Sequence, residues 1–186
     1  MLGKLSERFH KRANGWLVIA LLIVYGFFAG YVMPMMAANM NAAANQSVTP
    51  LDLMFFYSPD RAFEMMDRYG EAGRATYLTI ELTADIVYPI ASMSFFSLLL
   101  SWLFQRGFEP GSGIQRFNIA PVGSWFFDLI ENAVIVPMIL MDPARSALMA
   151  WLAMILGTVK WGFAFISLAL VLIGLVKAAM NGFKRQ

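Results

Sequence analysis

Between Arg12 and Asp52 the sequence carries no charged side chain. The apolar part of this stretch, residues 16–36, would be about 31 Å long as a helix, which matches the hydrocarbon core of a bilayer. Over the whole chain 59% of residues are hydrophobic and 14% are charged, whereas soluble domains average about 25% charged. A chain of 186 residues cannot bury so much apolar surface in its own core, so we expect a bilayer to be its solvent.

Three further apolar runs follow, and each is long enough to cross a bilayer. They cover about residues 77–104, 119–141 and 148–176. We therefore predict an all-α membrane protein, with residues 1–186 forming one domain. This domain would be a four-helix transmembrane bundle with a long outer loop over residues 37–76.

The distribution of Lys and Arg predicts the orientation of the spans, because cytoplasmic loops are enriched in these residues. The side that holds both termini carries Lys4, Arg8, Lys11, Arg12, Arg106, Arg116, Lys177, Lys184 and Arg185, and the opposite side carries Arg61, Arg68, Arg74 and Arg145. Both termini are therefore expected in the cytoplasm. A cleaved signal peptide is the alternative for residues 16–36, but this run is longer than a usual signal core and carries a Gly26-x-x-x-Gly30 pair.

The outer loop has its own pattern. Residues 39–49 are small and polar and predict irregular structure, and residues 51–57 are apolar and aromatic and suit the membrane interface. Ser58 followed by Pro59 predicts the start of a helix, and Gly70 predicts its end. We expect this short amphipathic helix to lie on the outer membrane face.

The scarcity of strong ligands and nucleophiles excludes several classes of function. The chain has no cysteine, which excludes disulfides, thiolate catalysis and iron–sulfur clusters, and its one histidine, His10, excludes a multi-histidine metal site. No Gly-rich phosphate loop is present. We therefore predict no cofactor and no metal. The isoelectric point of about 9.0 reflects basic residues at helix ends and does not indicate nucleic-acid binding.

The first set of polar residues within the spans contains Glu81, Asp85 and Tyr88, which share a helix face. Pro89 is expected to bend this helix and to free a backbone carbonyl. The set forms either a polar mouth that opens outward or a helix end surrounded by headgroups and water. The second interpretation is favoured for Glu81, and burial against protein is favoured for Asp85.

The second and third sets lie near the middle of the bilayer. Asp128, Glu131 and Asn132 share one stripe of a helix, and Lys160 lies at a matching depth on the last span. Buried acids are retained when a partner compensates them, so we predict that Lys160 pairs with Asp128 first and with Glu131 second. The alternative is a set of polar contacts that only fixes helix packing.

These residues together suggest an acidic pocket that binds a proton, a cation or a small cationic ligand. One alternative is a non-catalytic accessory subunit that contacts a membrane-protein partner through the Gly26/Gly30 face or the outer loop. A third hypothesis is a lipid-modifying enzyme, which is the weakest because no nucleophile stands beside a base. We therefore lean against catalysis.

The layout of four spans with a long first outer loop resembles claudin-type and vitamin K epoxide reductase-type proteins, but the cysteines of both families are missing. A closer resemblance is to a group of small uncharacterised prokaryotic four-helix integral membrane proteins. It rests on Leu51-Asp52-Leu53, Tyr57-Ser58-Pro59, Tyr69-Gly70, Gly73-Arg74-x-x-Tyr77, Asp85-x-x-Tyr88-Pro89, Asp128-x-x-Glu131-Asn132 and Lys160-Trp161. The resemblance implies a bacterial cytoplasmic (inner) membrane protein in which the loop and both acidic motifs belong to one assembly.

Overall fold

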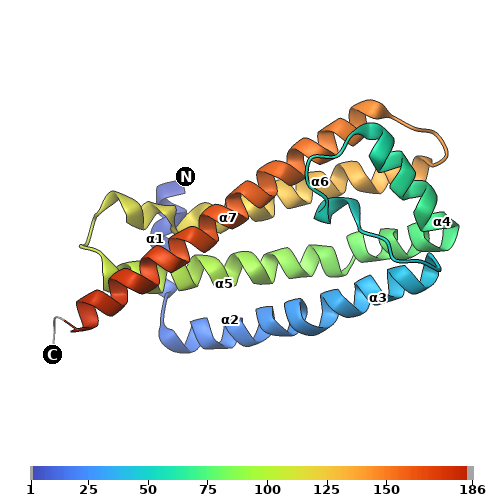
Figure 1. The fold of residues 1–186 in the computed structure, drawn as a ribbon. Coiled ribbons are helices and arrows are strands. Elements are labelled where there is room, and N and C mark those ends of the chain that lie inside the picture. The colour runs from blue at the N-terminus through green and yellow to red at the C-terminus, as the bar shows by residue number, and fades with distance from the viewer. Residues whose placement is uncertain (1, 184–186) are drawn as a thin grey trace. The chain divides into compact units, whose positions relative to one another are not determined.

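A computed structural model describes residues 2–183, and this part of the chain contains helices and connecting segments but no strand. The elements in chain order are α1 (Leu2–Arg12), α2 (Gly15–Phe27), the π-helix η1 (Phe28–Val32), α3 (Met33–Ala43), the 3-10 helix η2 (Leu51–Leu53), α4 (Pro59–Glu81), α5 (Ala84–Gly107), the 3-10 helix η3 (Gly113–Ile119), α6 (Ala120–Met141) and α7 (Ala147–Phe183) (Figure 1). The predicted all-α class is confirmed. Lys184 and Arg185, which contributed to the predicted orientation, lie outside the described residues.

Four helical stretches within residues 2–183 are long and apolar enough to cross a membrane. They are Gly15–Ala43, Pro59–Gly107, Gly113–Met141 and Ala147–Gly182. The number of predicted spans is therefore matched by helices of suitable length and composition.

The first of these stretches is longer than predicted. The outer loop was predicted to begin at residue 37, but the helix continues to Ala43. Residues 37–43 contain alanine and methionine and no glycine or proline, so their high helix propensity extends the helix. The irregular segment begins only after Ala43.

The helix predicted to begin after Ser58 is confirmed as the first part of α4. The Ser58 hydroxyl accepts a hydrogen bond from the Arg61 backbone N–H at 3.3 Å, and Pro59 occupies the first turn. Gly70 interrupts the helix with φ 63° and ψ 179°, a conformation that side chains with a Cβ rarely adopt. The predicted helix end at Gly70 is therefore correct, and a second helical segment runs from there to Glu81.

The second predicted span is divided at a different place from the one expected. The sequence predicted a helix over 77–104 that bends at Pro89, but the chain breaks at residues 82–83, between α4 and α5. Pro89 lies inside α5. Glu81 and Asp85 consequently lie at the facing ends of two helices.

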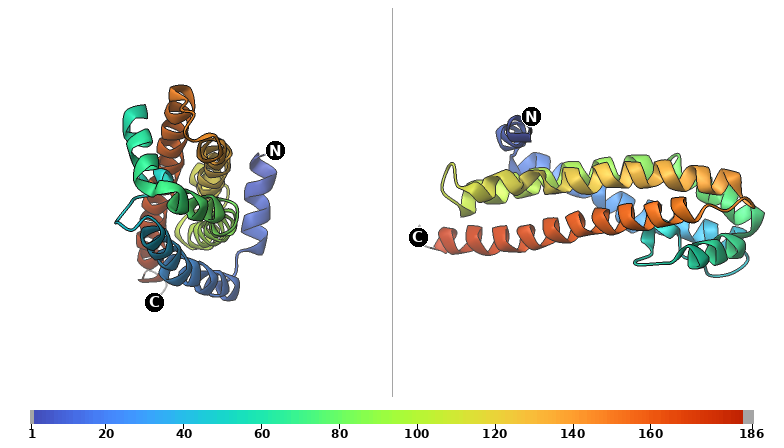
Figure 2. Two further views of the ribbon diagram at one scale, coloured as in Figure 1. Left: turned by 90° about the vertical axis from the view of Figure 1, so that its right-hand side faces the viewer. Right: turned by 90° about the horizontal axis from the view of Figure 1, so that it is seen from above.

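The described residues divide into two compact units, which are considered separately. The first unit consists of residues up to 25 together with 90–125 and 161–183. Its core joins Leu100, Leu103 and Phe104 of α5 to Val171 of α7. Figure 2 shows α1 crossing the direction of the α5 segment in this unit.

A buried polar chain attaches α1 to the rest of the first unit. The Ser6 hydroxyl donates to Asn118 Oδ1 at 2.7 Å, and Asn118 Nδ2 donates to the Ser101 hydroxyl at 2.7 Å. Hydrogen bonds between buried groups fix the position of this short helix.

The second unit consists of residues 26–89 and 126–160. Its core brings together α3, the segment before α4, α4 itself, α6 and the start of α7, with fully buried side chains that include Met40, Leu51, Tyr69, Tyr77 and Ile135. The Tyr69 hydroxyl donates to the Thr49 carbonyl at 2.6 Å and so attaches α4 to the preceding segment. This unit contains every candidate site residue.

Candidate functional site

The candidate residues of the three predicted polar sets are almost all buried in the second unit. Glu81, Asp85, Asp128, Glu131, Asn132 and Lys160 are each at most 7% exposed, and Tyr88 is half-buried. The predicted burial of Asp85 is confirmed. The favoured interpretation of Glu81 as an acid in the headgroup region is wrong, because Glu81 is 1% exposed.

Lys160 forms two ion pairs at the contact between α6 and α7. Its ammonium group lies 3.0 Å from Asp128 Oδ1 and 2.5 Å from Glu131 Oε2. The two acids are one turn apart on α6, so a single cation can reach both. The predicted pairing of Lys160 with both acids is confirmed, but their order is reversed, because Glu131, which was predicted as the second partner, lies closer than Asp128.

Gly157, one turn before Lys160 on α7, lets the two helices approach this closely. A Cβ atom at position 157 would lie 3.1 Å from Glu131 Cδ and closer still to Oε1. Small residues at helix contacts allow such approach. Glycine therefore provides the space that the Glu131 carboxylate occupies beside Lys160.

Asn132 connects α6 to the first turn of α5. Its side-chain amide donates to Asp85 Oδ2 at 2.9 Å and is 3.4 Å from the Asp85 backbone carbonyl. Pro89 has no N–H and cannot make the helical hydrogen bond to that carbonyl, four residues earlier. The predicted release of a carbonyl by Pro89 thus has a structural counterpart, because Asn132 occupies the position of the missing donor.

Glu81 and Asp85 meet a third acid, Asp52. One carboxylate oxygen from each of the three residues lies within 4.8 Å of the others. Asp52 Oδ1 also accepts a hydrogen bond from the Tyr77 hydroxyl at 2.8 Å. The break between α4 and α5 helps this meeting, because it lets the end of one helix and the start of the next face the η2 turn.

Asp52 belongs to this cluster but was not among the candidate site residues predicted from the sequence. Residues 51–57 were interpreted as an interfacial segment, but Asp52 is buried at 6% exposed. Phe55 and Phe56 in the same segment remain exposed. The available signal was that Asp52 is the first charged residue after Arg12 and stands between two leucines, an arrangement that usually requires a polar partner.

Several buried polar atoms around these acids accept or donate no hydrogen bond among the described residues. They are Glu81 Oε1, Glu81 Oε2, Asp128 Oδ2, Asn132 Oδ1 and the Tyr57 hydroxyl. Most buried polar atoms in proteins have a partner, which is a protein group, water or an ion. Their gathering in one unit is therefore typical of a binding site.

The phenol of Tyr57 interacts electrostatically with two of these acids, Glu131 and Asp52. Its burial raises the pKa of the phenol above the ordinary value, and the negative charges of Glu131 and Asp52 raise this pKa further. Tyr57 therefore remains a neutral hydrogen-bond donor over the physiological pH range.

The charge balance of this part of the molecule is strongly acidic. The buried charged residues of the second unit comprise the acids Asp52, Glu81, Asp85, Asp128 and Glu131 and the single base Lys160. We call these residues, with Asn132, the carboxylate centre. Lys160 supplies one positive charge for five buried acids, so the remaining negative charge has to be offset by protons or by a bound cation.

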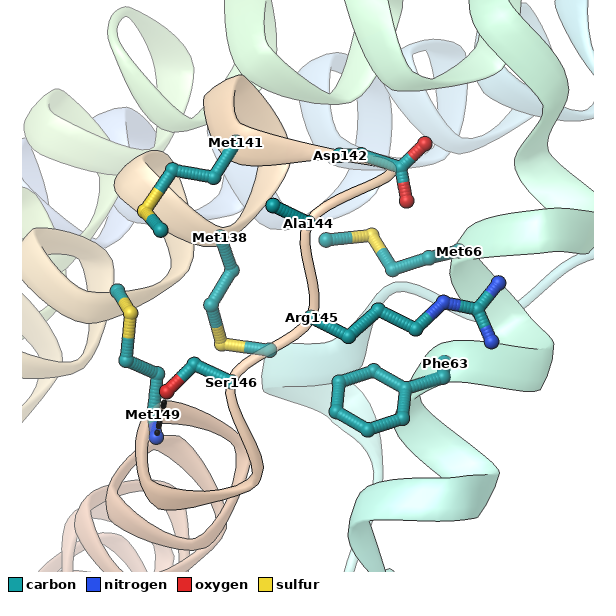
Figure 3. A pocket seen from close by; sticks show the side chains of 9 residues that line it. All are labelled: Phe63, Met66, Met138, Met141, Asp142, Ala144, Arg145, Ser146 and Met149. Atoms are coloured by element: carbon teal, nitrogen blue, oxygen red, sulfur yellow. Dashed lines mark hydrogen bonds between the residues drawn. The ribbon is translucent and has the colours of Figure 1, made fainter.

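A small pocket of the second unit has a different character (Figure 3). It is lined by Phe63, Met66, Met138, Met141, Asp142, Ala144, Arg145, Ser146 and Met149. Arg145 lies 5.4 Å from the centre of the Phe63 ring and also pairs with Asp67. The lining includes no residue of the carboxylate centre, and its apolar thioether and aromatic groups do not suit a hard cation.

Comparison with protein-family models, with curated proteins and with solved structures found no match for this chain. The function is therefore inferred from the geometry of the carboxylate centre.

Proposed function

We propose that this chain is a multi-pass protein of the bacterial cytoplasmic membrane whose carboxylate centre binds a cation. In this proposal the four apolar stretches cross the membrane as a bundle and both termini are cytoplasmic. The first part of α4 lies at the outer face. The orientation is supported by the distribution of Lys and Arg in the sequence.

The observation that carries the proposal is the excess of buried acids over buried bases in the second unit. Five buried carboxyl groups share one buried lysine among the described residues. Burying an uncompensated charge is costly, so such a cluster persists only with compensating positive charge. A proton, a metal cation or a small organic cation would each supply that charge.

The chemistry of the centre favours binding over catalysis. Its side chains are carboxylates, one amide, neighbouring tyrosines and a lysine whose charge is held by two acids. This set provides ligands for a positive charge but no nucleophile beside a free base. We therefore place lipid modification behind cation binding.

The test uses the full chain purified into lipid nanodiscs. Isothermal titration calorimetry with Na⁺, K⁺, Mg²⁺ and Ca²⁺, together with a dye that reports released protons, is expected to detect saturable binding of at least one cation. Glu81→Gln and Asp85→Asn should weaken that binding, whereas Glu64→Gln, at an exposed acid that pairs with Arg61, should not. The absence of both cation binding and proton release would contradict the proposal.

A second candidate function is an accessory subunit of a membrane-protein complex. Gly26 and Gly30 are exposed on the first apolar stretch, and a Cβ at either position would meet no described atom within 4 Å. Such a face suits close approach of a partner helix. Native mass spectrometry after mild solubilisation should show a stoichiometric partner that Gly26→Leu removes, and a lone chain would exclude this candidate.

A further inference from the structure

We infer that Asp52, Glu81 and Asp85 are the ligands of a hard divalent cation, of the class of Ca²⁺, Mg²⁺ or Mn²⁺. The inference deepens the proposed function and rests on it, because it names the cation class and the ligands. It also assigns the two halves of the carboxylate centre different roles. Lys160 pairs with Asp128 and Glu131, and the metal binds at the other three acids.

The spacing of the three acids suits a metal ion. Their nearest ligand oxygens all lie within 4.8 Å of one another. Two oxygens on opposite sides of a cation are about 4.2 Å apart for Mg²⁺ and about 4.6–5.2 Å apart for Ca²⁺. The three oxygens are thus close enough together to bind one cation of this class.

Glu81 provides the independent observation that points to a ligand. It is 1% exposed, and neither of its carboxylate oxygens has a hydrogen-bond partner among the described residues. Tyr77 cannot satisfy it, since its single hydroxyl hydrogen is donated to Asp52 at 2.8 Å. A cation between the three acids would compensate the charge of Glu81 and occupy its oxygens at once.

The surroundings of the three acids supply further features of an oxygen-ligand site. Asn132 holds Asp85 in place through its amide nitrogen, and its amide oxygen has no hydrogen-bond partner among the described residues. Carboxylate and amide oxygens are the ligands that Ca²⁺ prefers. The prediction of no metal rested on the absence of cysteine and on the single histidine, so it bears on sites with sulfur or imidazole ligands and leaves this oxygen-ligand class open.

The ammonium group of Lys160 supplies one positive charge to the carboxylate centre. It is held between Asp128 and Glu131 at 3.0 Å and 2.5 Å. One lysine and one divalent cation together would supply three positive charges for the five acids, and protons can offset the two negative charges that remain.

The experiment measures ⁴⁵Ca²⁺ binding to the full chain in lipid nanodiscs. We expect saturable binding of about one ion per chain, displaced by excess Mg²⁺ or Mn²⁺ but not by Na⁺ at the same ionic strength. Glu81→Gln keeps the shape of the side chain and removes its charge, so it should lower the affinity at least tenfold. Glu64→Gln is the matched control and should leave the affinity unchanged, because Glu64 is exposed.

A second measurement needs no variant. Tb³⁺ replaces Ca²⁺ at oxygen sites, and its luminescence is excited through a nearby tyrosine. Because Tyr77 contacts Asp52 directly, the wild-type chain should sensitise Tb³⁺, and Ca²⁺ should quench the signal by displacement. Absence of both Ca²⁺ binding and Tb³⁺ luminescence would overturn the inference even if Glu81→Gln fails to fold.

The outcomes separate this inference from the proposed function. If the calorimetric or proton-release test succeeds while no divalent cation binds, the metal site is wrong and the cation-binding function stands. If no cation of any kind binds and no proton is released, both fail. Equal Ca²⁺ affinity in the wild type and in Glu81→Gln would place the ion elsewhere and would also overturn the inference.

Discussion

The carboxylate of Glu131 occupies the space left by the missing side chain of Gly157. A Cβ at position 157 would approach Glu131 Cδ to 3.1 Å, which is closer than ordinary van der Waals contact. Glu131 in turn contacts Lys160 at 2.5 Å. The ion pair and the close helix approach therefore depend on one another.

Gly157→Ala is expected to destabilise the protein by about 1–3 kcal/mol, because the added methyl group forces Glu131 or the helices to move. The matched control is Gly162→Ala in the same helix, where a Cβ meets no described atom within 4 Å and the higher helix propensity of alanine should help. Thermal unfolding in detergent, followed by circular dichroism, compares the two. Equal midpoints would contradict the close contact.

Lys160→Met is expected to destabilise the protein by about 3–5 kcal/mol, because it leaves two buried acids without their cation. Lys177→Met, at an exposed lysine of the same helix, should have little effect. Adding Glu131→Gln to Lys160→Met should restore part of the loss, because it removes one of the uncompensated charges. Denaturant unfolding in mixed micelles measures all three, and a loss below about 1 kcal/mol for Lys160→Met would contradict a tightly held pair.

Asn132→Leu is expected to cost about 1–3 kcal/mol, because Asp85 loses hydrogen bonds from Asn132. In a Pro89→Ala background the cost should be smaller, because a backbone N–H at position 89 can reach the Asp85 carbonyl. The hydrogen bond that Asn132 donates to the Asp85 carboxylate would still be lost in that background. A double-mutant cycle of unfolding free energies should give a coupling of about 0.5–1 kcal/mol. Strict additivity would show that the effects of Pro89 and Asn132 on stability are independent.

The raised pKa of Tyr57 predicts a stability that declines in strong base. A phenol ionises near pH 10 in the unfolded chain, and burial beside Glu131 and Asp52 moves the folded pKa above that value. The contribution of Tyr57 is therefore fully present below about pH 10 and is lost as the pH rises toward the folded pKa. Tyr57→Phe should flatten this decline in unfolding measurements between pH 8 and 11 (roughly the range that brackets a free phenol), and an unchanged slope would show that Tyr57 is not responsible.

The proposed orientation can be tested with single cysteines, because the natural chain contains none. Asp60→Cys and Glu109→Cys change exposed residues on opposite sides of the second apolar stretch. In intact cells a membrane-impermeant maleimide should label position 60 and not position 109, and both should react after lysis. Labelling of position 109 alone in intact cells would reverse the orientation.

Several features of the fold follow from local sequence. The apolar runs fixed the number of long helices, Ser58 and Pro59 marked a helix start, and Gly70 marked a helix break. These signals are local, because hydrophobic length, capping and backbone conformation act on neighbouring residues. The pairing of Lys160 with Asp128 and Glu131 was also predictable, since buried charges of opposite sign and equal depth have few other partners.

The tertiary structure alone decided the composition of the carboxylate centre. The sequence marks Asp52 as an isolated charge, but only folding brings it to Tyr77, Glu81 and Asp85 from a distant turn. The helix breaks at residues 82–83, where the sequence has no glycine or proline that would predict a break. Glu81, directly before this break, is buried. Contacts between segments far apart in the chain depend on how whole helices pack, and the periodicity of a single helix carries no information about that packing.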